Sequence, residues 1–274
     1  MTTEQLKNRI QNAVNDLRLS ANALDSPSSI SLPTICQNRI REFQNIADRL
    51  DQIPPIIDAR EYARQILQNL RDSSSSDITS DLVEFQGMQL PFSVARLLGF
   101  QSYLPITWSI CDLVTKEIGK FVCISSDTWK TNKPAKLWEH FVRDNKASAF
   151  QSHFFLKESY GFPIGISYAI RNHFVHDAAL YDGNSLFESE SISNGFQISN
   201  TGKKYLQDKM QQYKINQNQI RGVNLSHNWY DEHEDLLELL ELCHRELDDA
   251  LGCLIGWSVG TAKLQVKFLL ERDI

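Results

Sequence analysis

The C-terminal part of the chain contains one uninterrupted helical pattern, and this feature constrains the fold more than any other. No proline occurs in residues 231–270, and leucines are frequent in the first half of that stretch. A stretch of this length without a helix breaker predicts a single long helix. Gly252, Gly256 and Gly260 lie four residues apart within it. This spacing predicts a smooth groove for another helix, either of the same chain or, as an alternative, across an oligomer interface.

The same helical period recurs in the N-terminal part of the chain. Apolar residues lie three and four apart through residues 6–24, 40–50 and 57–70. Such spacing is typical of one face of an amphipathic helix. Each stretch ends at prolines, serines or both. Three helices are therefore expected here, as an antiparallel hairpin or a coiled-coil-like arm.

Further helices are expected in the middle of the chain. Pro91 suits the first position of a helix, and the apolar pattern after it continues to residue 118, with a break expected at Pro105. Residues 136–155 have a helical pattern as well. Residues 164–180 are apolar on most sides, which is typical of a helix in the centre of a fold.

Glycine and proline are scarce, with 12 and 8 residues respectively, which disfavours a fold built from tight turns. Strands are indicated only at residues 185–189 and 195–199, which are expected to pair as a hairpin. The predicted fold class is all-α: an antiparallel helical bundle with an N-terminal helical extension and one small β-hairpin. The serine-rich residues 72–77 suggest a boundary, giving an N-terminal helical hairpin or arm at 1–85 and a bundle domain at 86–274.

Composition restricts the classes of function. The formal net charge of −6 does not indicate a uniformly basic nucleic-acid-binding face. Any such contact must come from a local cluster or from a site between two chains. The five cysteines are odd in number and lack CxxC spacing, which favours reduced thiols and a cytoplasmic location. No leader pattern is visible, and the longest apolar run is shorter than the ~20 residues of a membrane span.

The apolar stretch at residues 164–180 contains a run of polar residues that are suited to chemistry. The run comprises Arg171, Asn172, His173, His176 and Asp177. On a helix, Asn172 and His176 are i,i+4 neighbours, and the long side chain of Arg171 can reach the same place. Arginine binds phosphate through a planar fork, and histidine transfers protons near neutral pH. This set suits cleavage of a phosphodiester, without a metal if the RNA 2′-hydroxyl is the nucleophile.

The pattern Arg171-Asn172-x-x-x-His176 resembles the signature of HEPN-type ribonucleases, in which a late helix carries an arginine, a polar residue and then a histidine. The resemblance implies a metal-independent endoribonuclease that needs no cofactor and is active as a homodimer with a composite site. In that site Arg171 would stabilise the pentacoordinate phosphate, His176 would act as acid or base, and Asn172 would hold the geometry. Many relatives are toxins or anti-phage defence effectors, so an antitoxin partner is also implied.

Several alternatives remain open. His173 is a candidate for substrate binding, although a hydrogen-bonded core histidine is the favoured interpretation. Lys130 and Lys133, close to Trp129 and Lys136, are candidate RNA contacts, or else part of a solvated loop.

A metal site at His173, His176 and Asp177, completed by His140 or His153, is a further alternative. A non-catalytic helical interaction module, or one that binds a nucleotide, is the second class of function. The two classes differ in geometry, because catalysis requires an accessible Arg171–His176 run and a purely structural role does not.

Overall fold

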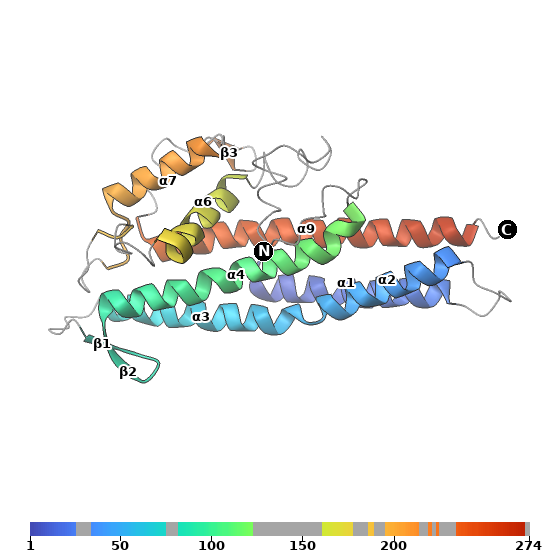
Figure 1. The fold of residues 1–274 in the computed structure, drawn as a ribbon, viewed down its shortest axis with the longest axis horizontal. Helices are drawn as coiled ribbons and strands as arrows, with labels where there is room; N and C mark the ends of the chain where they lie inside the picture. Colours follow the sequence, from blue (N-terminus) through green and yellow to red (C-terminus); the bar gives the residue numbers. More distant parts are fainter. Residues whose placement is uncertain are drawn as a thin grey trace.

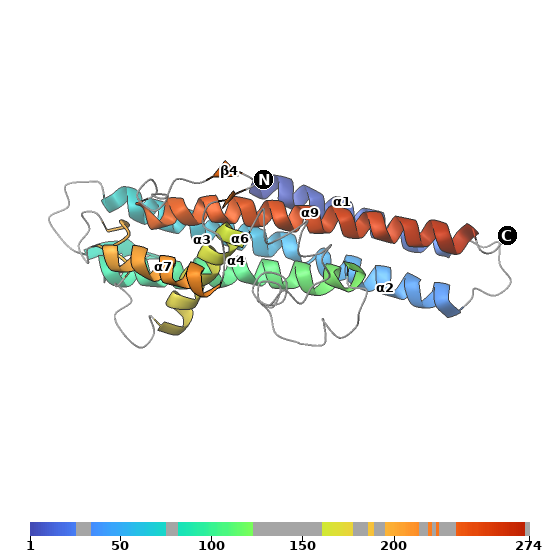
Figure 2. The ribbon, with the colours of Figure 1, turned by 90° about the horizontal axis from the view of Figure 1, so that it is seen from above.

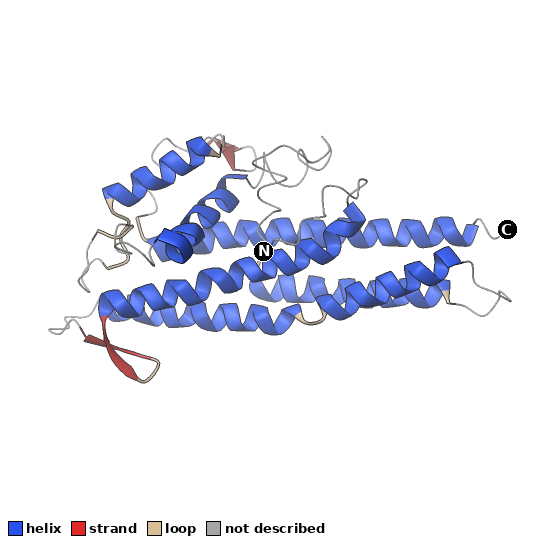
Figure 3. Cartoon of the chain, viewed as in Figure 1, coloured by secondary structure: helices blue, strands red, loops and turns tan. Residues whose placement is uncertain are grey.

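The computed structural model describes residues 1–25, 34–74, 82–122, 161–177, 186–188, 195–213, 219–220, 223–224 and 234–271. Helices account for 85% of the described residues (Figure 3), which confirms the predicted all-α class. Within these ranges, no helix is long and apolar enough to cross a bilayer.

Long helices run side by side along the longest axis of the molecule (Figures 1 and 2). They are α1 (Thr3–Leu24), α2 (Thr34–Leu50), α3 (Ile53–Ser74), α4 (Phe92–Val122) and α9 (Leu236–Glu271). Helix α9 extends along the whole bundle, whereas α2 and α3 follow each other end to end. The predicted long C-terminal helix is thus confirmed, and it packs on both α1 and α4.

Side-chain caps define the first residues of two of these helices. At α1, the Thr2 hydroxyl accepts from the Gln5 amide at 3.2 Å, and the Gln5 side chain accepts from the Thr2 amide at 2.8 Å. This reciprocal pair satisfies two amides that the first helical turn leaves open. At α9, the Asp235 carboxylate accepts from the Glu238 amide at 2.9 Å. Helix α9 therefore begins directly after a capping aspartate.

The prolines at 54 and 55 mark the division between α2 and α3 as expected, whereas Pro105 does not break α4. Pro54 and Pro55 lie in the first turn of α3, where a missing amide hydrogen has no consequence. Helix α4 continues through Pro105, so the break expected there is wrong. The buried Tyr103 and Trp108 on either side of Pro105 anchor the helix in the core. This packing outweighs the loss of one backbone hydrogen bond.

The main β-hairpin lies at a position that the sequence analysis did not predict. Strands β1 (Leu82–Phe85) and β2 (Met88–Pro91) pair antiparallel. Gln86 and Gly87 join them with φ of 51° and 80°, the left-handed pair of a type I′ turn. Pro91 therefore ends a strand, and α4 begins one residue later.

The predicted pairing of residues 185–189 with 195–199 is confirmed for residues 186–188, the part of the first segment that the structure describes. Phe187 and Ile198 form an isolated antiparallel bridge, and the Glu188 amide donates to the Gln197 carbonyl at 2.9 Å. A second small sheet pairs β3 (Gln219–Ile220) with β4 (Val223–Asn224).

One hydrophobic core joins the N-terminal helices to the rest of the bundle, since α1 packs on α9 and α3 packs on α4. The predicted division at residue 85 stays a prediction, because packing alone does not show whether residues 1–85 fold independently. Part of the glycine groove on α9 is filled from within the chain. The Arg9 guanidinium donates to the Gly252 carbonyl at 2.9 Å.

A shorter helical layer lies against one end of the bundle (Figure 1). It comprises α6 (Gly161–Asn172), the π-helical segment η2 (His173–Asp177) and α7 (Asn200–Gln212). Helix α6 packs on α9 and α7, and each of its residues from Gly161 to Ile170 is buried. The burial on most sides expected for this helix is confirmed, although α6 lies in the layer at one end of the bundle and not at its centre. The polar run follows directly after the buried residues.

Candidate functional site

Arg171 and Asn172 occupy the last two positions of α6, where burial changes abruptly. The ten residues before them are buried, whereas both of these side chains are partly exposed. The Arg171 Nη1 donates to the Asn172 Oδ1 at 2.8 Å. Asn172 therefore holds the guanidinium, as an orienting residue would. A positive side chain at a helix C-terminus is also favoured by the helix dipole, which is the structural alternative for Arg171.

The helix changes its geometry directly after this pair. Residues 173–177 form a π-helical turn, with i→i+5 hydrogen bonding in place of i→i+4. In an α-helix, positions five apart lie on different sides because a turn takes 3.6 residues. A π turn takes more residues than an α turn, so the backbone of His176 lies closer to the side of the helix from which the Arg171 side chain projects. Such π turns are frequent at functional sites.

Helix α4 supports the π turn from beneath. The Gln101 side-chain amide donates to the Phe174 carbonyl at 3.3 Å. The Phe174 ring stacks on Phe100 with centroids 5.0 Å apart. One polar and one aromatic contact therefore hold the segment that carries His176.

His173 is buried, with 6% of its surface exposed. Its ring meets the Tyr205 ring of α7 at a centroid distance of 5.3 Å and an angle of 63°. This environment agrees with the core-histidine interpretation rather than with direct contact to a substrate.

Some predicted residues lie outside the described parts of the chain. These are Lys130 and Lys133, their neighbours Trp129 and Lys136, and the alternative ligands His140 and His153. The side chains of His176 and Asp177 are likewise outside the description, although their backbone is placed in η2. Among the described residues, no group of three His, Cys, Asp or Glu side chains is arranged to hold a metal ion.

Two residues of α7 were missed by the sequence analysis. Tyr205 is half-buried, and its hydroxyl donates to the Ala169 carbonyl of α6 at 3.3 Å. The Lys209 ammonium lies 5.4 Å from the centre of the Tyr205 ring. The sequence did not single them out, because lysines with a tyrosine one helical turn before Lys209 are an ordinary pattern on an amphipathic helix.

A second polar centre lies inside the bundle, between α3, α4, α6 and α9. The Trp108 indole donates to the Ser167 hydroxyl at 3.2 Å, and Ser167 Oγ lies 2.9 Å from His244 Nε2. On the other side of the ring, Tyr103 Oη lies 2.6 Å from His244 Nδ1. Burial, helped by the charge of Arg60, lowers the pKa of His244 to about 3, so the imidazole is neutral.

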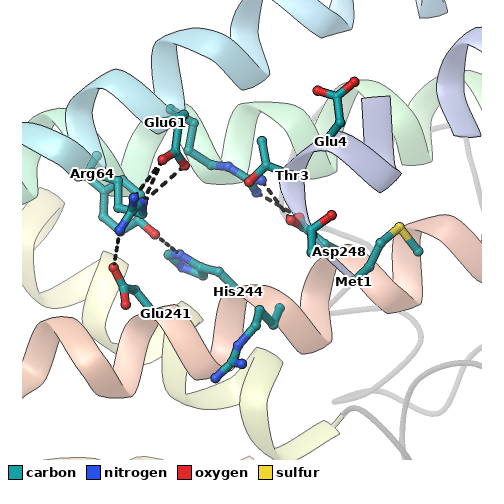
Figure 4. Close-up of a pocket in the computed structure, with 12 residues that line it drawn as sticks. Met1, Thr3, Glu4, Glu61, Arg64, Glu241, His244 and Asp248 are labelled. Atoms are coloured by element: carbon teal, nitrogen blue, oxygen red, sulfur yellow. Dashed lines mark hydrogen bonds and ion pairs between the residues drawn. The ribbon is translucent and has the colours of Figure 1, made fainter. Parts of the chain in front are cut away.

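Ion pairs lie beside this chain of hydrogen bonds. Arg60 and Asp248 form a buried bidentate pair with both distances at 2.7 Å. Arg64 lies between Glu61 and Glu241 and pairs with both (Figure 4). The adjoining cavity holds about 500 Å³. Because Ser167 is fully buried and the ion pairs satisfy one another, the arrangement is suited to fixing the packing of α3 against α9 rather than to nucleophilic catalysis.

Two of the buried cysteine thiols are unsuited to act as nucleophiles. Cys36, Cys111 and Cys243 are free and buried. Burial raises the pKa of the Cys111 and Cys243 thiols. Both stay protonated, and a thiol in that state is a poor nucleophile.

Comparison with protein-family models, with curated proteins and with solved structures found no match to this chain. The resemblance to HEPN ribonucleases therefore rests on Arg171, Asn172 and His176 and on their place in a helical bundle.

Proposed function

We propose that the protein is a metal-independent endoribonuclease whose site is built on Arg171, Asn172 and His176. The observation that carries the proposal is the partly exposed Arg171–Asn172 pair, joined at 2.8 Å, directly before the π turn that contains His176. A guanidinium held by an amide is set to bind phosphate. The otherwise buried helix gives the pair a rigid base.

In the proposed reaction, the 2′-hydroxyl oxygen of the RNA attacks the adjacent phosphorus. A histidine takes the proton of that hydroxyl, and the 5′-oxygen of the next nucleotide leaves and receives a proton. The products are a 2′,3′-cyclic phosphate and a 5′-hydroxyl. The Arg171 guanidinium stabilises the charge that develops on the phosphorane, and Asn172 keeps it in place.

The reaction needs both an acid and a base. One copy of the segment 171–176 offers a single favoured proton carrier, His176. We therefore propose a homodimer in which two Arg171–His176 runs face a shared cleft. An antitoxin or other regulatory partner would act by covering that cleft.

The test is incubation of the purified chain with total RNA in EDTA, beside a DNA substrate of matched sequence. RNA should be cut and DNA should remain intact, because deoxyribose lacks the nucleophile. His176→Ala should lower the rate by about 10²–10⁴-fold, the usual contribution of a positioned proton carrier. Arg171→Ala should lower it by a similar factor, and His173→Ala should have a much smaller effect.

Circular dichroism and thermal unfolding must show that each variant is folded, since the run follows a buried helix. Full activity of a folded His176→Ala variant would contradict the proposal. Loss of activity in EDTA with recovery on adding a divalent ion would replace it with the metal alternative at His173, His176 and Asp177.

A non-catalytic interaction module remains the second candidate, and one observation favours it. Leu264 and Phe268 lie one helical turn apart on α9 and are 69% and 53% exposed. Paired apolar side chains on one helix face are typical of a surface that contacts another protein. Absence of cleavage together with binding of a partner chain through this face would favour the second candidate.

A further inference from the structure

Helix α7 lies alongside α6 (Figure 1). Its Tyr205 ring contacts His173, the first residue of η2. Tyr205 and Lys209 are one helical turn apart on α7, and both are half-buried. Each of the two residues is therefore partly accessible from outside. This combination of ring and charge is the usual chemistry of a single-stranded nucleic-acid contact.

Two contacts with α6 and η2 fix the Tyr205 ring. Its hydroxyl donates to the Ala169 carbonyl at 3.3 Å. Its ring and the His173 ring form a T-shaped contact with centroids 5.3 Å apart. The ring is therefore held by both ends, so little conformational entropy is lost when a flat ligand packs against it.

Lys209 supplies a positive charge beside that ring. Its ammonium is 5.4 Å from the ring centre, within the range of a cation–π contact. Its hydrogen bond to the Gln212 side chain is long, at 3.4 Å. A contact of this length is weak, which leaves the ammonium able to turn toward a phosphate.

The ring lies on the same side of α6 as the candidate run. Positions 169, 172 and 173 follow the i,i+3 and i,i+4 spacing of one helix face, and the π turn that carries His176 continues from the last of them. Tyr205 contacts the first and third of these positions. The second is Asn172, which draws the Arg171 guanidinium toward itself. A nucleotide on Tyr205 would therefore have its neighbouring phosphate near Arg171.

We propose that Tyr205 and Lys209 form a nucleotide subsite in which the ring stacks on one base and the ammonium binds an adjacent phosphate. This inference rests on the proposed ribonuclease function and names its substrate class, single-stranded RNA. Bases paired in a duplex are stacked on one another and cannot pack on the ring, whereas unpaired bases can.

The test separates binding from cleavage. The probe is a short, fluorescently labelled single strand with 2′-O-methyl riboses, which cannot be cut because the nucleophile is blocked. Tyr205→Leu should weaken binding of this probe by about 5- to 150-fold, the range for one base–aromatic stack. Tyr205→Phe keeps the ring and should bind within about 3-fold of the wild-type protein, as expected if stacking is the main contribution.

Salt dependence tests the lysine. Lys209→Gln should lower the slope of log affinity against log salt by about 0.7, the value for one phosphate contact on a single strand. The matched control is Lys204→Gln, on the same helix and exposed, which has no ion pair or hydrogen bond within the described part of the chain. This control should change the slope much less than Lys209→Gln.

The outcomes distinguish this inference from the proposed function. Cleavage with unchanged probe binding in Tyr205→Leu would overturn the subsite and leave the ribonuclease proposal in place. Equal affinity for the single strand and its duplex would overturn the subsite as well. Loss of binding in Tyr205→Leu with rescue by Tyr205→Phe would support the subsite, even for a chain that cleaves nothing.

Discussion

Among single residues, His244 combines a titratable ring with nearly complete burial, at 4% exposure. Its pKa is lowered to about 3, chiefly by burial, from an ordinary value of 6.5 in the unfolded chain. Between these two values the unfolded chain binds a proton at this position and the folded chain does not. The free energy of unfolding must therefore fall as the pH falls from 6.5 toward 3.

We expect this residue to lower the free energy of unfolding by about 2–3 kcal/mol between pH 7 and pH 4.5. His244→Gln removes the titration, so its stability should fall less steeply over that range. Urea unfolding at several pH values measures, for each protein, the slope of the free energy of unfolding against pH. Equal slopes for the wild-type protein and the variant would contradict the lowered pKa of His244.

The candidate site residues differ in how far they could be predicted. Arg171 and Asn172 stood out because charge is unusual in an apolar helix, and the structure places both, partly exposed, in the last two positions of α6. Tyr205 was not found, because a tyrosine on an amphipathic helix is ordinary in sequence. Its interest comes from its contact with His173, which depends on how α7 packs on α6.

The three glycines of helix α9 differ in how closely other parts of the chain approach them. A Cβ added at Gly256 or Gly260 would meet nothing within 4 Å, whereas one added at Gly252 would meet Met1 and Arg9. Gly256→Ala and Gly260→Ala should each raise the free energy of unfolding by about 0.5–1 kcal/mol, because alanine loses less backbone entropy. Gly252→Ala should show no such gain.

Chemical denaturation of the three variants measures these changes. The same gain at all three positions would contradict the close approach of α1 at Gly252. A loss of stability at Gly256 or Gly260 would mean that another chain occupies this part of the groove, as in the oligomer alternative.

The helices were more predictable than the turns. Amphipathic periodicity correctly located α1, α2, α3 and α9, because burial of one face repeats every turn. The β1–β2 hairpin was missed because its turn uses Gln86 at positive φ, a conformation that glutamine rarely adopts. The predicted break at Pro105 was wrong because packing of the neighbouring side chains in the core keeps α4 continuous. A rule that considers only the proline and its sequence neighbours does not include this packing.

For the whole molecule, the proposed homodimer leads to a quantitative expectation. Wild-type protein mixed with growing amounts of inactive His176→Ala should lose activity as the square of the wild-type fraction, because a composite site needs both copies intact. Autonomous sites would give a linear decrease. Sedimentation at micromolar concentration provides the control, and a monomer there would count against the dimer.

The packing of α1 on α9 has a consequence for the order in which the protein acquires its structure. Arg9 and Gly252 are 243 residues apart in sequence yet hydrogen-bonded, and Arg60 reaches Asp248 across 188 residues. During synthesis, α1 with α2 and α3 with α4 can associate as soon as they emerge. The side of α1 that meets α9 stays exposed until α9 has been made. A ribosome-bound chain is therefore expected to expose this apolar surface of α1 until then, a state that is prone to aggregation and suited to chaperones.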